Sequence, residues 1–475
     1  MIGTPDYGYY HTGVRQPIHL RGCSNFRGHF YDQYWPTLQT LDLDDVSCVN
    51  INSEAYRHAL LAHAGCGLPE LEVSAQDTFC LIFTSGTTGA PKACICSHGR
   101  ITANVQTMID HQELCPDDIS YISMPLFHSN ALMSGVLPSL GVGAAMVLRR
   151  KFSATGFLPD IRRYGVTYFS YVGKPLAYIL ATPQRADDAD TTLRRGFGNE
   201  AAYADLRAFE QRFGCTLMDA YGSTEGGVAM VRGSDTPAGS LGLAMSPGMV
   251  VMDPQTQREC PRARFDCDGN LLNSEEATGE LVNTEGVAGF EGYWKNEEAN
   301  AKRTRGGVVW MGDRAYRDTE GYFYFVGRDT DGMRVDGENI STAQIEQVLV
   351  RHPDVVVAAV YGVPDAMPGD RIMAALQLRD GVDFDVVTFT DFLRSQRDFG
   401  SKWLPLFIRI ASTLPMTHTS KVIKQRLRRE KWRCEDPIWW QSGPAATWSR
   451  LTTADIEHWE QQFIDGGRAS ALHLV

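Results

Sequence analysis

The chain has 475 residues. Since domains usually span ~100–200 residues, two or three structural units are expected. The formal net charge of -12 argues against a general nucleic-acid-binding protein, because phosphate backbones select positive surfaces. No apolar run approaches the ~20 residues needed for a membrane-spanning helix, although peripheral membrane contact stays open.

The eleven cysteines include no CxxC pair, and no HExxH sequence accompanies the histidines, which argues against the common zinc patterns. Reduced thiols are therefore expected. The first residues contain neither a basic stretch nor an apolar one, so no signal peptide is expected. Together these features predict a cytoplasmic protein.

Residues 1–50 are rich in aromatic residues, Gly and Pro and show little periodicity. Strand-like runs then alternate with helical patterns, beginning with FCLIF and the helix SHGRITANVQTMIDHQEL, for which Ser97 is the expected N-cap. This alternation predicts an α/β fold with largely parallel strands. Residues 236–326 show short runs broken by turn residues, which predicts a smaller, β-barrel-like antiparallel part. We expect one large multi-subdomain N-terminal region over residues 1–328.

The pattern of predicted strands and helices changes after residue 328. Ser341 and Gln344 form a capping-box pattern that would open the helix STAQIEQVLVRH. The strand-like runs VVVAAVYGV and RIMAALQL follow, and then a helix near VVTFTDFLRSQRD and the run FIRIAS. Residues 329–475 are therefore expected to form a small α+β domain.

The stretch LIFTSGTTGAPK places four hydroxyls, two glycines and a lysine directly behind an apolar run. A polar loop between a strand and a helix explains it. A phosphate cradle explains it too, because hydroxyls and glycine N–H groups can surround a polyphosphate while a lysine adds charge. The stretch is not a Walker A motif, since Ala90 and Pro91 separate Gly89 from Lys92. Alone, it leaves both interpretations open.

Four further segments bear on the choice between these two interpretations. They are YGSTEGG at 221–227, WMGDRAYRDTEGYFYFVGR at 310–328, GENIST at 337–342 and LPMTHTSKVIK at 414–424. Each is ordinary by itself: a turn, a surface hairpin, a helix start and a loop with a lysine. Their joint occurrence in this order needs a common explanation.

Together the five segments resemble the adenylate-forming superfamily of acyl-CoA synthetases, nonribosomal-peptide adenylation domains and luciferases, from about Asp77 to the C-terminus. GNE at 198–200, TEGG, THTSK and DPIWW are most similar to the fatty acid transport protein/very-long-chain acyl-CoA synthetase branch. The resemblance implies an acid–thiol ligase that uses ATP and Mg²⁺ to join a long- or very-long-chain fatty acid to CoA. An acyl-adenylate would be the intermediate, with pyrophosphate and then AMP released.

The resemblance also implies roles for individual residues. The β- and γ-phosphates would be bound by the loop residues Thr84, Ser85, Gly86, Thr87, Thr88, Gly89 and Lys92. The adenine and ribose would contact Gly198, Asn199, Glu200, Tyr221, Asp313 and Arg328, and Gly337 would lie at the edge of the pantetheine channel. The catalytic groups would be Lys421, Thr224, Glu225 and His128. Glu225 would also bind Mg²⁺, a hard cation that prefers carboxylate and phosphate oxygens.

In the superfamily the small C-terminal domain rotates between the two half-reactions. The aligned hinge residue here is Thr330, and the lysine motif reads Thr419-Ser420-Lys421. The run from Lys421 to Arg433 carries seven basic residues against one acidic residue. We interpret it as a solvated helix face, with contact to CoA phosphate or anionic lipid as the alternative.

Two other functions stay open. One is an acyl-AMP ligase that delivers the acyl group to a carrier protein instead of CoA. The other is a catalytically weak nucleotide- or lipid-binding remnant, because the hydroxyl-rich loop arrives at Thr84, earlier than is usual in the family. We accordingly expect an incomplete first subdomain. The acyl chain length and the oligomeric state are not predicted.

Overall fold

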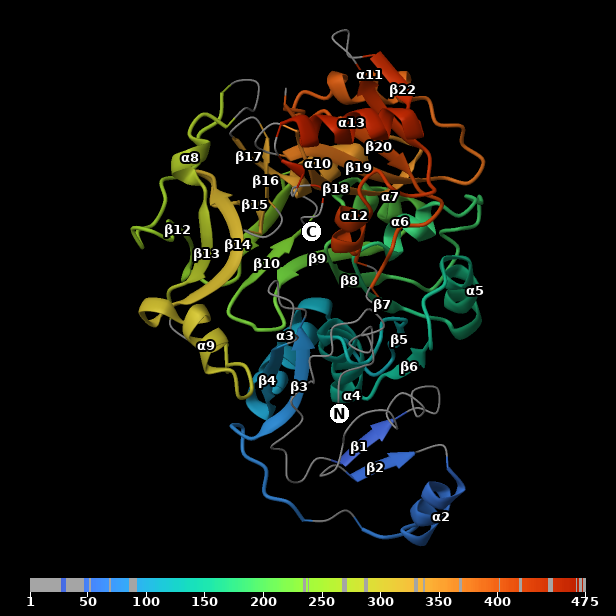
Figure 1. Cartoon of the computed structure of the whole chain (residues 1–475). Coiled ribbons are helices and arrows are strands. Elements are labelled where there is room, and N and C mark those ends of the chain that lie inside the picture. Colours follow the sequence, from blue (N-terminus) through green and yellow to red (C-terminus); the bar gives the residue numbers. More distant parts are fainter. Residues whose placement is uncertain are drawn as a thin grey trace.

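The computed structural model describes residues 27–30, 47–50, 53–67, 70–84, 92–233, 236–237, 239–266, 271–285, 289–328, 332–335, 338–366, 370–400, 402–417, 421–442, 447–466, 468–469 and 472. Figure 1 shows a large mixed sheet in the middle of the molecule and a smaller C-terminal sheet above it. The predicted α/β class with a smaller α+β part is confirmed.

The first elements lie at the lower end of Figure 1. Strands β1 (Arg27–Phe30) and β2 (Ser47–Asn50) pair in parallel, and helix α2 (Glu54–Ala62) follows. Strands β3 (Thr78–Thr84) and β4 (Lys92–Ser97) then pair antiparallel. Of the two interpretations of the hydroxyl-rich stretch, the one with a loop between a strand and a helix did not include β4, the strand that precedes helix α3.

Alternating burial explains β4. Cys94 and Cys96 are fully buried while the residues between and before them are only half-buried, which is the period of two typical of a strand. Helix α3 (His98–Gln112) begins directly afterwards. Ser97 is its N-cap, as predicted, and its Oγ accepts a hydrogen bond from the Arg100 N–H at 3.1 Å.

The central sheet has eleven strands in the order β12-β13-β14-β15-β11-β10-β9-β8-β7-β5-β6. Its parallel half alternates with helices, as the sequence predicts. The parallel strands are β5 (Ile119–Ile122), β6 (Ala145–Leu148), β7 (Tyr168–Val172), β8 (Arg195–Asn199) and β9 (Thr216–Gly222).

The helices of this half are η3 (Ala131–Val136, a π-helix), α4 (Leu137–Val142), α5 (Ala154–Tyr164), α6 (Pro175–Leu180) and α7 (Tyr203–Phe213). Three of them end at glycines with positive φ, namely Gly143, Gly165 and Gly214. Such residues are the usual C-caps, because glycine has no Cβ to clash in the left-handed conformation. Aromatic side chains of α5, β7 and α7 fill the core between sheet and helices.

The antiparallel half continues the same sheet, because β9 pairs in parallel with β8 and antiparallel with β10. It contains β10, which precedes residue 236, and the antiparallel strands expected from about residue 236 to 326. These are β10 (Ala229–Arg232), β11 (Ser240–Ala244), β12 (Met249–Met252), β13 (Gly279–Asn283), β14 (Val309–Arg317) and β15 (Phe323–Arg328). The short helices α8 (Ser274–Ala277), α9 (Glu297–Arg303) and η4 (Arg305–Gly307) precede β13 and β14.

The C-terminal part opens with the hairpin β16 (Gly332–Val335) and β17 (Glu338–Ser341) and helix α10 (Thr342–Leu349). Ser341 is the N-cap of α10, but its side chain makes no capping hydrogen bond, so the predicted capping box is wrong in that detail. The reason is that Ser341 also ends strand β17, and its Oγ is buried without a partner among the described residues.

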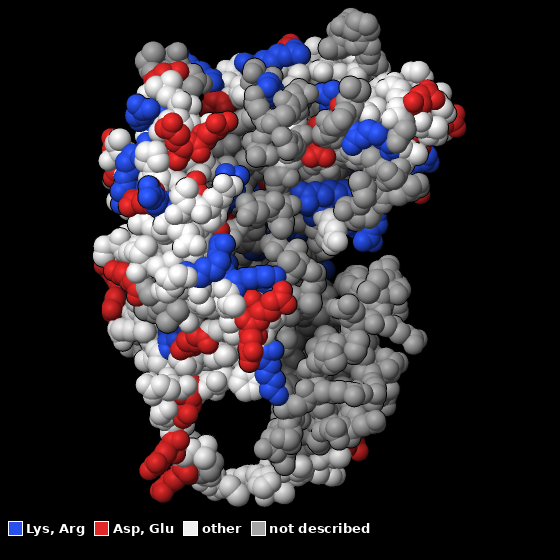
Figure 2. Space-filling model, turned by 60° about the vertical axis from the view of Figure 1, so that its left-hand side comes forward, with Lys and Arg blue, Asp and Glu red and all other residues white. Residues whose placement is uncertain are grey.

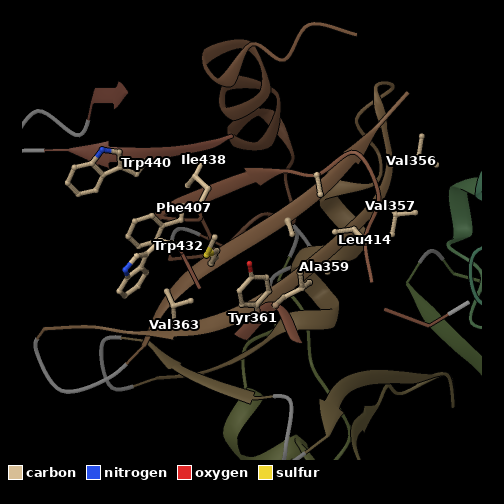
Figure 3. Packing of buried hydrophobic residues seen from close by; sticks show 14 of the residues in the cluster. Val356, Val357, Ala359, Tyr361, Val363, Phe407, Leu414, Trp432, Ile438 and Trp440 are labelled. Atoms are coloured by element: carbon tan, nitrogen blue, oxygen red, sulfur yellow. The ribbon is translucent and has the colours of Figure 1, made fainter. Parts of the chain in front are cut away.

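A five-stranded sheet completes this part, in the order β18-β19-β20-β21-β22. The remaining elements are β18 (Val355–Pro364), β19 (Asp370–Leu378), α11 (Val386–Ser395), β20 (Phe407–Ile410), α12 (Lys424–Glu430), β21 (Ile438–Ser442), β22 (Thr447–Arg450) and α13 (Thr453–Asp465). Figure 3 shows the ring of Phe407 beside those of Trp432 and Trp440 in its core. The Phe407 and Trp440 rings are stacked with an interplanar angle of 7°.

The proposed division after residue 328 lies next to residues 329–331, which are outside the described ranges. We keep it as a proposal, supported by the separate five-stranded sheet and by a hydrophobic cluster made only of C-terminal residues, among them Met333, Ile345 and Phe389. Within the described ranges, no helix combines the length and the apolar character needed to cross a membrane. On the face in Figure 2, basic and acidic side chains are interspersed over the described surface.

Candidate functional site

Several predicted site residues fall outside the part of the chain that the structure describes. These are Ser85, Gly86, Thr87, Thr88, Gly89 and Gly337, together with the hinge residue Thr330 and the motif residues Thr419 and Ser420. The two ends of the hydroxyl-rich loop, Thr84 and Lys92, are described. They face each other directly as Cα partners at the end of the β3–β4 hairpin.

Thr84 and Glu225, which are 141 residues apart in sequence, meet at this end of the hairpin. The Thr84 Oγ1 donates to Oε1 of Glu225 at 3.2 Å. Glu225 follows β9 in the turn that leads to the antiparallel half of the sheet. The structure therefore brings Thr84, the first residue of the hydroxyl-rich loop, to the TEGG segment, as the resemblance implies.

The Glu225 carboxylate is buried, with 9% of the residue exposed, and is held from several elements. The Tyr293 hydroxyl donates to it at 2.9 Å, Ser223 Oγ donates to its second oxygen, and Arg303 lies 3.7 Å away. Burial alone would raise the pKa of Glu225, but the Arg303 charge and these hydrogen bonds lower it below its ordinary value. Glu225 is therefore a buried carboxylate whose surroundings favour its ionised form.

The Lys92 ammonium lies over the ring of Tyr293, with Nζ 5.3 Å from the ring centroid. Burial lowers the pKa of Lys92, and the nearby positive charge of Arg303 lowers it further, while Glu225 opposes both effects. The region thus combines two cations with one carboxylate. Such a group of charges favours an anionic ligand with several oxygens.

Thr224 is fixed through both its side chain and its carbonyl. Its Oγ1 lies 3.0 Å from Ser129 Oγ, and either hydroxyl can be the donor. Its carbonyl accepts hydrogen bonds from the Arg100 guanidinium and from the Cys94 thiol, the latter at 3.3 Å. Arg100 also donates to the carbonyl of Ile95 at 3.0 Å, so it ties the TEGG turn to strand β4.

A chain of amide hydrogen bonds connects His128 with the GNE segment. Asn130 donates its backbone N–H to His128 Nδ1 at 3.2 Å and its side-chain NH₂ to Asn199 Oδ1 at 3.0 Å. Asn199 in turn donates to the carbonyl of Ala220 at 2.6 Å. Burial lowers the pKa of His128 to about 4, with the Lys421 charge adding to the effect. The imidazole is therefore neutral near pH 7.

The GNE segment stands at the carboxyl end of β8, next to β9. A Cβ at Gly198 would lie 2.2 Å from the ring of Tyr171, so only glycine fits there. Glu200 adopts a positive φ of 66°, which is uncommon for a non-glycine residue and is often found at functional sites.

The ribose side of the predicted site is assembled from three strands. The Tyr221 hydroxyl on β9 donates to Oδ2 of Asp313 on β14, and Asp313 is only 4% exposed. Asp313 stands directly opposite Arg328 in the pairing of β14 with β15. The structure thus brings together the three positions that the resemblance assigns to this part of the nucleotide.

Lys421 reaches the site from the C-terminal part. Its Nζ lies 2.6 Å from Oε1 of Glu200, and both side chains are substantially exposed. Several basic residues that follow Lys421 in the sequence form ion pairs with acidic residues of the same chain. Lys424 contacts Glu346 at 2.7 Å and Arg426 contacts Glu430 at 2.8 Å. These pairs favour the interpretation of α12 as an ordinary helix face.

The described residues contain no group of three or more His, Cys, Asp or Glu side chains that could hold a metal ion by themselves. A Mg²⁺ ion that accompanies a nucleotide needs less, since one or two carboxylates, waters and phosphate oxygens complete its octahedron. Glu225 fits this use, because its carboxylate is buried beside Thr84 and kept ionised by its neighbours.

Some residues of the site carry no signal that sequence reasoning used. Ser129 and Asn130 directly follow His128 in MPLFHSN, so their position in that motif could have suggested them. Arg100, Tyr293 and Arg303 stand in helical or loop segments without a motif. Only the fold brings them to Thr224 and Glu225.

Comparison with known proteins gives a consistent result. The model of the AMP-binding enzyme family matches residues 35–294, and that of the AMP-binding enzyme C-terminal domain matches residues 344–421. A medium/long-chain-fatty-acid–CoA ligase FadD17 of Mycobacterium marinum is 48% identical over 85% of this chain and 77% of its own length. A steroid-22-oyl-CoA synthetase of Rhodococcus jostii is 43% identical over 91% of this chain and 79% of its own.

Long-chain fatty acid transport protein 5 of Mus musculus is more distant, with 33% identity over 78% of this chain and 56% of its own length. Among solved structures, the anthranilate CoA ligase AuaEII in complex with anthranoyl-AMP superimposes with a TM-score of 0.72. The superposition covers 89% of this chain and 80% of that one at 21% identity, which supports the fold.

Proposed function

The chain belongs to the AMP-binding enzyme family, as an adenylate-forming acid–thiol ligase, and we propose that it joins a medium- or long-chain fatty acid to coenzyme A at the expense of ATP. The superfamily and the ligase class predicted from the sequence are thereby confirmed. The proposal adds the class of carboxylic acid that serves as the substrate.

The relatives support a medium- or long-chain acid more than a very-long-chain one. The FadD17 relative is 48% identical, whereas the transport-protein relative reaches 33%. The steroid-22-oyl-CoA synthetase, 43% identical over 91% of this chain, supports a second candidate: a bulky polycyclic carboxylic acid. The names of these three relatives are those of a fatty-acid–CoA ligase, a steroid-CoA synthetase and a fatty acid transport protein, and none is named as a carrier-protein ligase.

In the proposed first step, the fatty-acid carboxylate attacks the α-phosphate of ATP and pyrophosphate leaves. This step concentrates anionic oxygens around phosphorus, so the protein contributes mainly positioning and positive charge. Thr84 and Lys92 would bind the β- and γ-phosphates from the two ends of the loop, and Thr224 would contact the α-phosphate. Mg²⁺ held by Glu225 would neutralise phosphate charge.

His128 and Lys421 would act on the acid. Because the His128 imidazole is neutral near pH 7, it would orient the acyl carboxylate by a hydrogen bond, without a formal charge. The Lys421 ammonium would leave Glu200 and bridge the carboxylate and the α-phosphate. In the second step the CoA thiolate would attack the acyl carbonyl and AMP would depart, with Gly337 beside the pantetheine.

The observation that carries this proposal is the meeting of Thr84 with the buried Glu225, next to the Lys92 ammonium. The test is pyrophosphate release with ATP, Mg²⁺ and a panel of carboxylic acids: C8 to C24 fatty acids and a steroid side-chain acid. Addition of CoA or of an acyl carrier protein then identifies the acceptor by thioester formation. We expect the highest kcat/KM with a C8–C18 acid and CoA.

Preference for the steroid acid would favour the second candidate. If a thioester forms only on the carrier protein, the carrier protein and not CoA is the acceptor. If no acid leads to pyrophosphate release, a nucleotide- or lipid-binding remnant is favoured.

Cytoplasmic location and peripheral membrane contact stay predictions. The eight described cysteines that are free thiols are in keeping with the first.

A further inference from the structure

Arg303 is an arginine of the candidate site to which neither the sequence motifs nor the proposed function gives a role. It is the last residue of α9, a helix that packs against β14. Its side chain is only 17% exposed and extends toward Glu225. A buried arginine usually has its five N–H donors satisfied, because the charged group is costly to remove from water.

The contacts of Arg303 among the described residues do not satisfy all of its N–H donors. Its Nη2 lies 3.7 Å from Oε1 of Glu225, which is an ion pair but too long for a good hydrogen bond. Its Nε is buried and has no hydrogen-bond partner among the described residues. Glu225 is moreover shared, since Thr84 and Tyr293 both donate to the same Oε1.

Arg303 also shares the Glu225 carboxylate with a second cation, Lys92. Arg303 and Lys92 are two cations that face one carboxylate, and they stand beside Thr84 at the start of the hydroxyl-rich loop. A further divalent cation on Glu225 would remove the carboxylate from Arg303 altogether. Arg303 would then need an anion with several oxygens, which a planar guanidinium can bind through two parallel hydrogen bonds.

We propose that Arg303 binds the terminal phosphates of ATP and the pyrophosphate that leaves, and that its pairing with Glu225 is the resting arrangement without nucleotide. This inference rests on the proposed function. The alternative is that Arg303 only supports Glu225 as a structural counter-ion. The two differ in one respect: AMP has no β- or γ-phosphate, so a phosphate-binding arginine contributes nothing to its affinity.

The test uses the whole chain with Arg303→Gln, which removes the charge at similar size, and Arg303→Lys, which keeps it. Lys302→Ala is the matched control, because Lys302 is the neighbouring cation, is 71% exposed and pairs with the exposed Glu298 in the preceding turn of the helix. Isothermal calorimetry in EDTA, without Mg²⁺, gives Kd for a non-hydrolysable ATP analogue, for pyrophosphate and for AMP, so that a disturbed Glu225 cannot act on these affinities through the metal. Thermal midpoints of all variants check folding.

For Arg303→Gln we expect about 10–100-fold weaker binding of the ATP analogue and of pyrophosphate, as for loss of charge-assisted hydrogen bonds, with AMP binding unchanged. Arg303→Lys should lie between, and Lys302→Ala should match the wild type. Equal losses for AMP and ATP, or no loss for either, would overturn the role of Arg303. A wild type that binds none of the three ligands would overturn the proposed function as well.

Discussion

Glu225 and Lys421 are the two principal charges of the candidate site, and the structure holds them in opposite ways. The Glu225 side chain is 12% exposed and contacts groups from β3, α9 and the segment around Tyr293. Lys421 is 43% exposed and pairs with Glu200, which is 50% exposed. Glu225 is therefore held by buried contacts, whereas Lys421 is attached to the site by an exposed ion pair.

This difference indicates which charged group of the site is already in position before a substrate binds. Removing the contacts of a buried carboxylate leaves a buried charge uncompensated, so moving Glu225 out of its position is costly. An exposed ion pair contributes only about 0–1 kcal/mol. Lys421 can therefore exchange Glu200 for a substrate at little cost, which suits a group needed in only one of two half-reactions.

The largest expected effect concerns Lys421. Lys421→Ala should lower the rate of acyl-adenylate formation by ~10²–10³, because it removes a charge from the α-phosphate during attack. Thioester formation from a pre-made acyl-adenylate should stay near the wild-type rate. Both rates can be followed by single-turnover mass spectrometry. Adenylation at the wild-type rate would show that Lys421 is not the exchanged charge.

Glu225→Gln tests the fixed charge. The variant keeps the size of the side chain but loses the charge that would bind Mg²⁺, so half-saturation by Mg²⁺ should require a ~10–100-fold higher concentration. Pyrophosphate release measured over a Mg²⁺ titration gives this number. An unchanged titration curve in a variant with a normal thermal midpoint would remove Glu225 as the ligand.

Asp313 should behave like Glu225, since it is buried and already receives the Tyr221 hydrogen bond. If its carboxylate also accepts from the ribose, 2′-deoxy-ATP should have a KM about tenfold higher than that of ATP, because an acceptor is left without a partner. Asp313→Ala should remove this discrimination. Steady-state kinetics with both nucleotides are sufficient, and equal KM values in the wild type would contradict the assignment.

The smallest effect is expected for Glu200→Gln, which breaks the surface pair but leaves Lys421 in place. The free energy of unfolding should change by less than ~1 kcal/mol, and the adenylation rate by no more than a few-fold. Urea denaturation and pyrophosphate release measure the two quantities. A loss as large as that of Lys421→Ala would mean that Glu200 itself has a direct part in the reaction.

The sequence predicted the elements that depend on local pattern. Ser97 caps α3 and the alternation of strands and helices gives the parallel half of the sheet, because capping and periodicity are short-range properties. Strand β4 was missed, since a six-residue strand between a glycine-rich loop and a helix gives little periodicity. The capping bond of Ser341 failed because the same residue also ends a strand.

For the site, motifs indicated residues that occur in recognisable strings, such as Glu225, Asp313 and Lys421. They could not indicate Tyr293 and Arg303, whose contacts with Glu225 span 68 residues of sequence for Tyr293 and a similar stretch for Arg303. Such contacts depend on where the loop after β13 and helix α9 pack, which is a property of the tertiary fold.

The contact between Gly198 and Tyr171 sets a rule for anyone who wishes to change the nucleotide preference of this chain by directed evolution. A library that varies Gly198 would consist mostly of damaged proteins, because any Cβ overlaps the Tyr171 ring and that ring is anchored through its hydroxyl to the buried Asp219. Glu200, two residues further on, has a half-exposed side chain, so substitutions there meet no such overlap, and its positive φ favours Gly, Asn and Asp over β-branched residues.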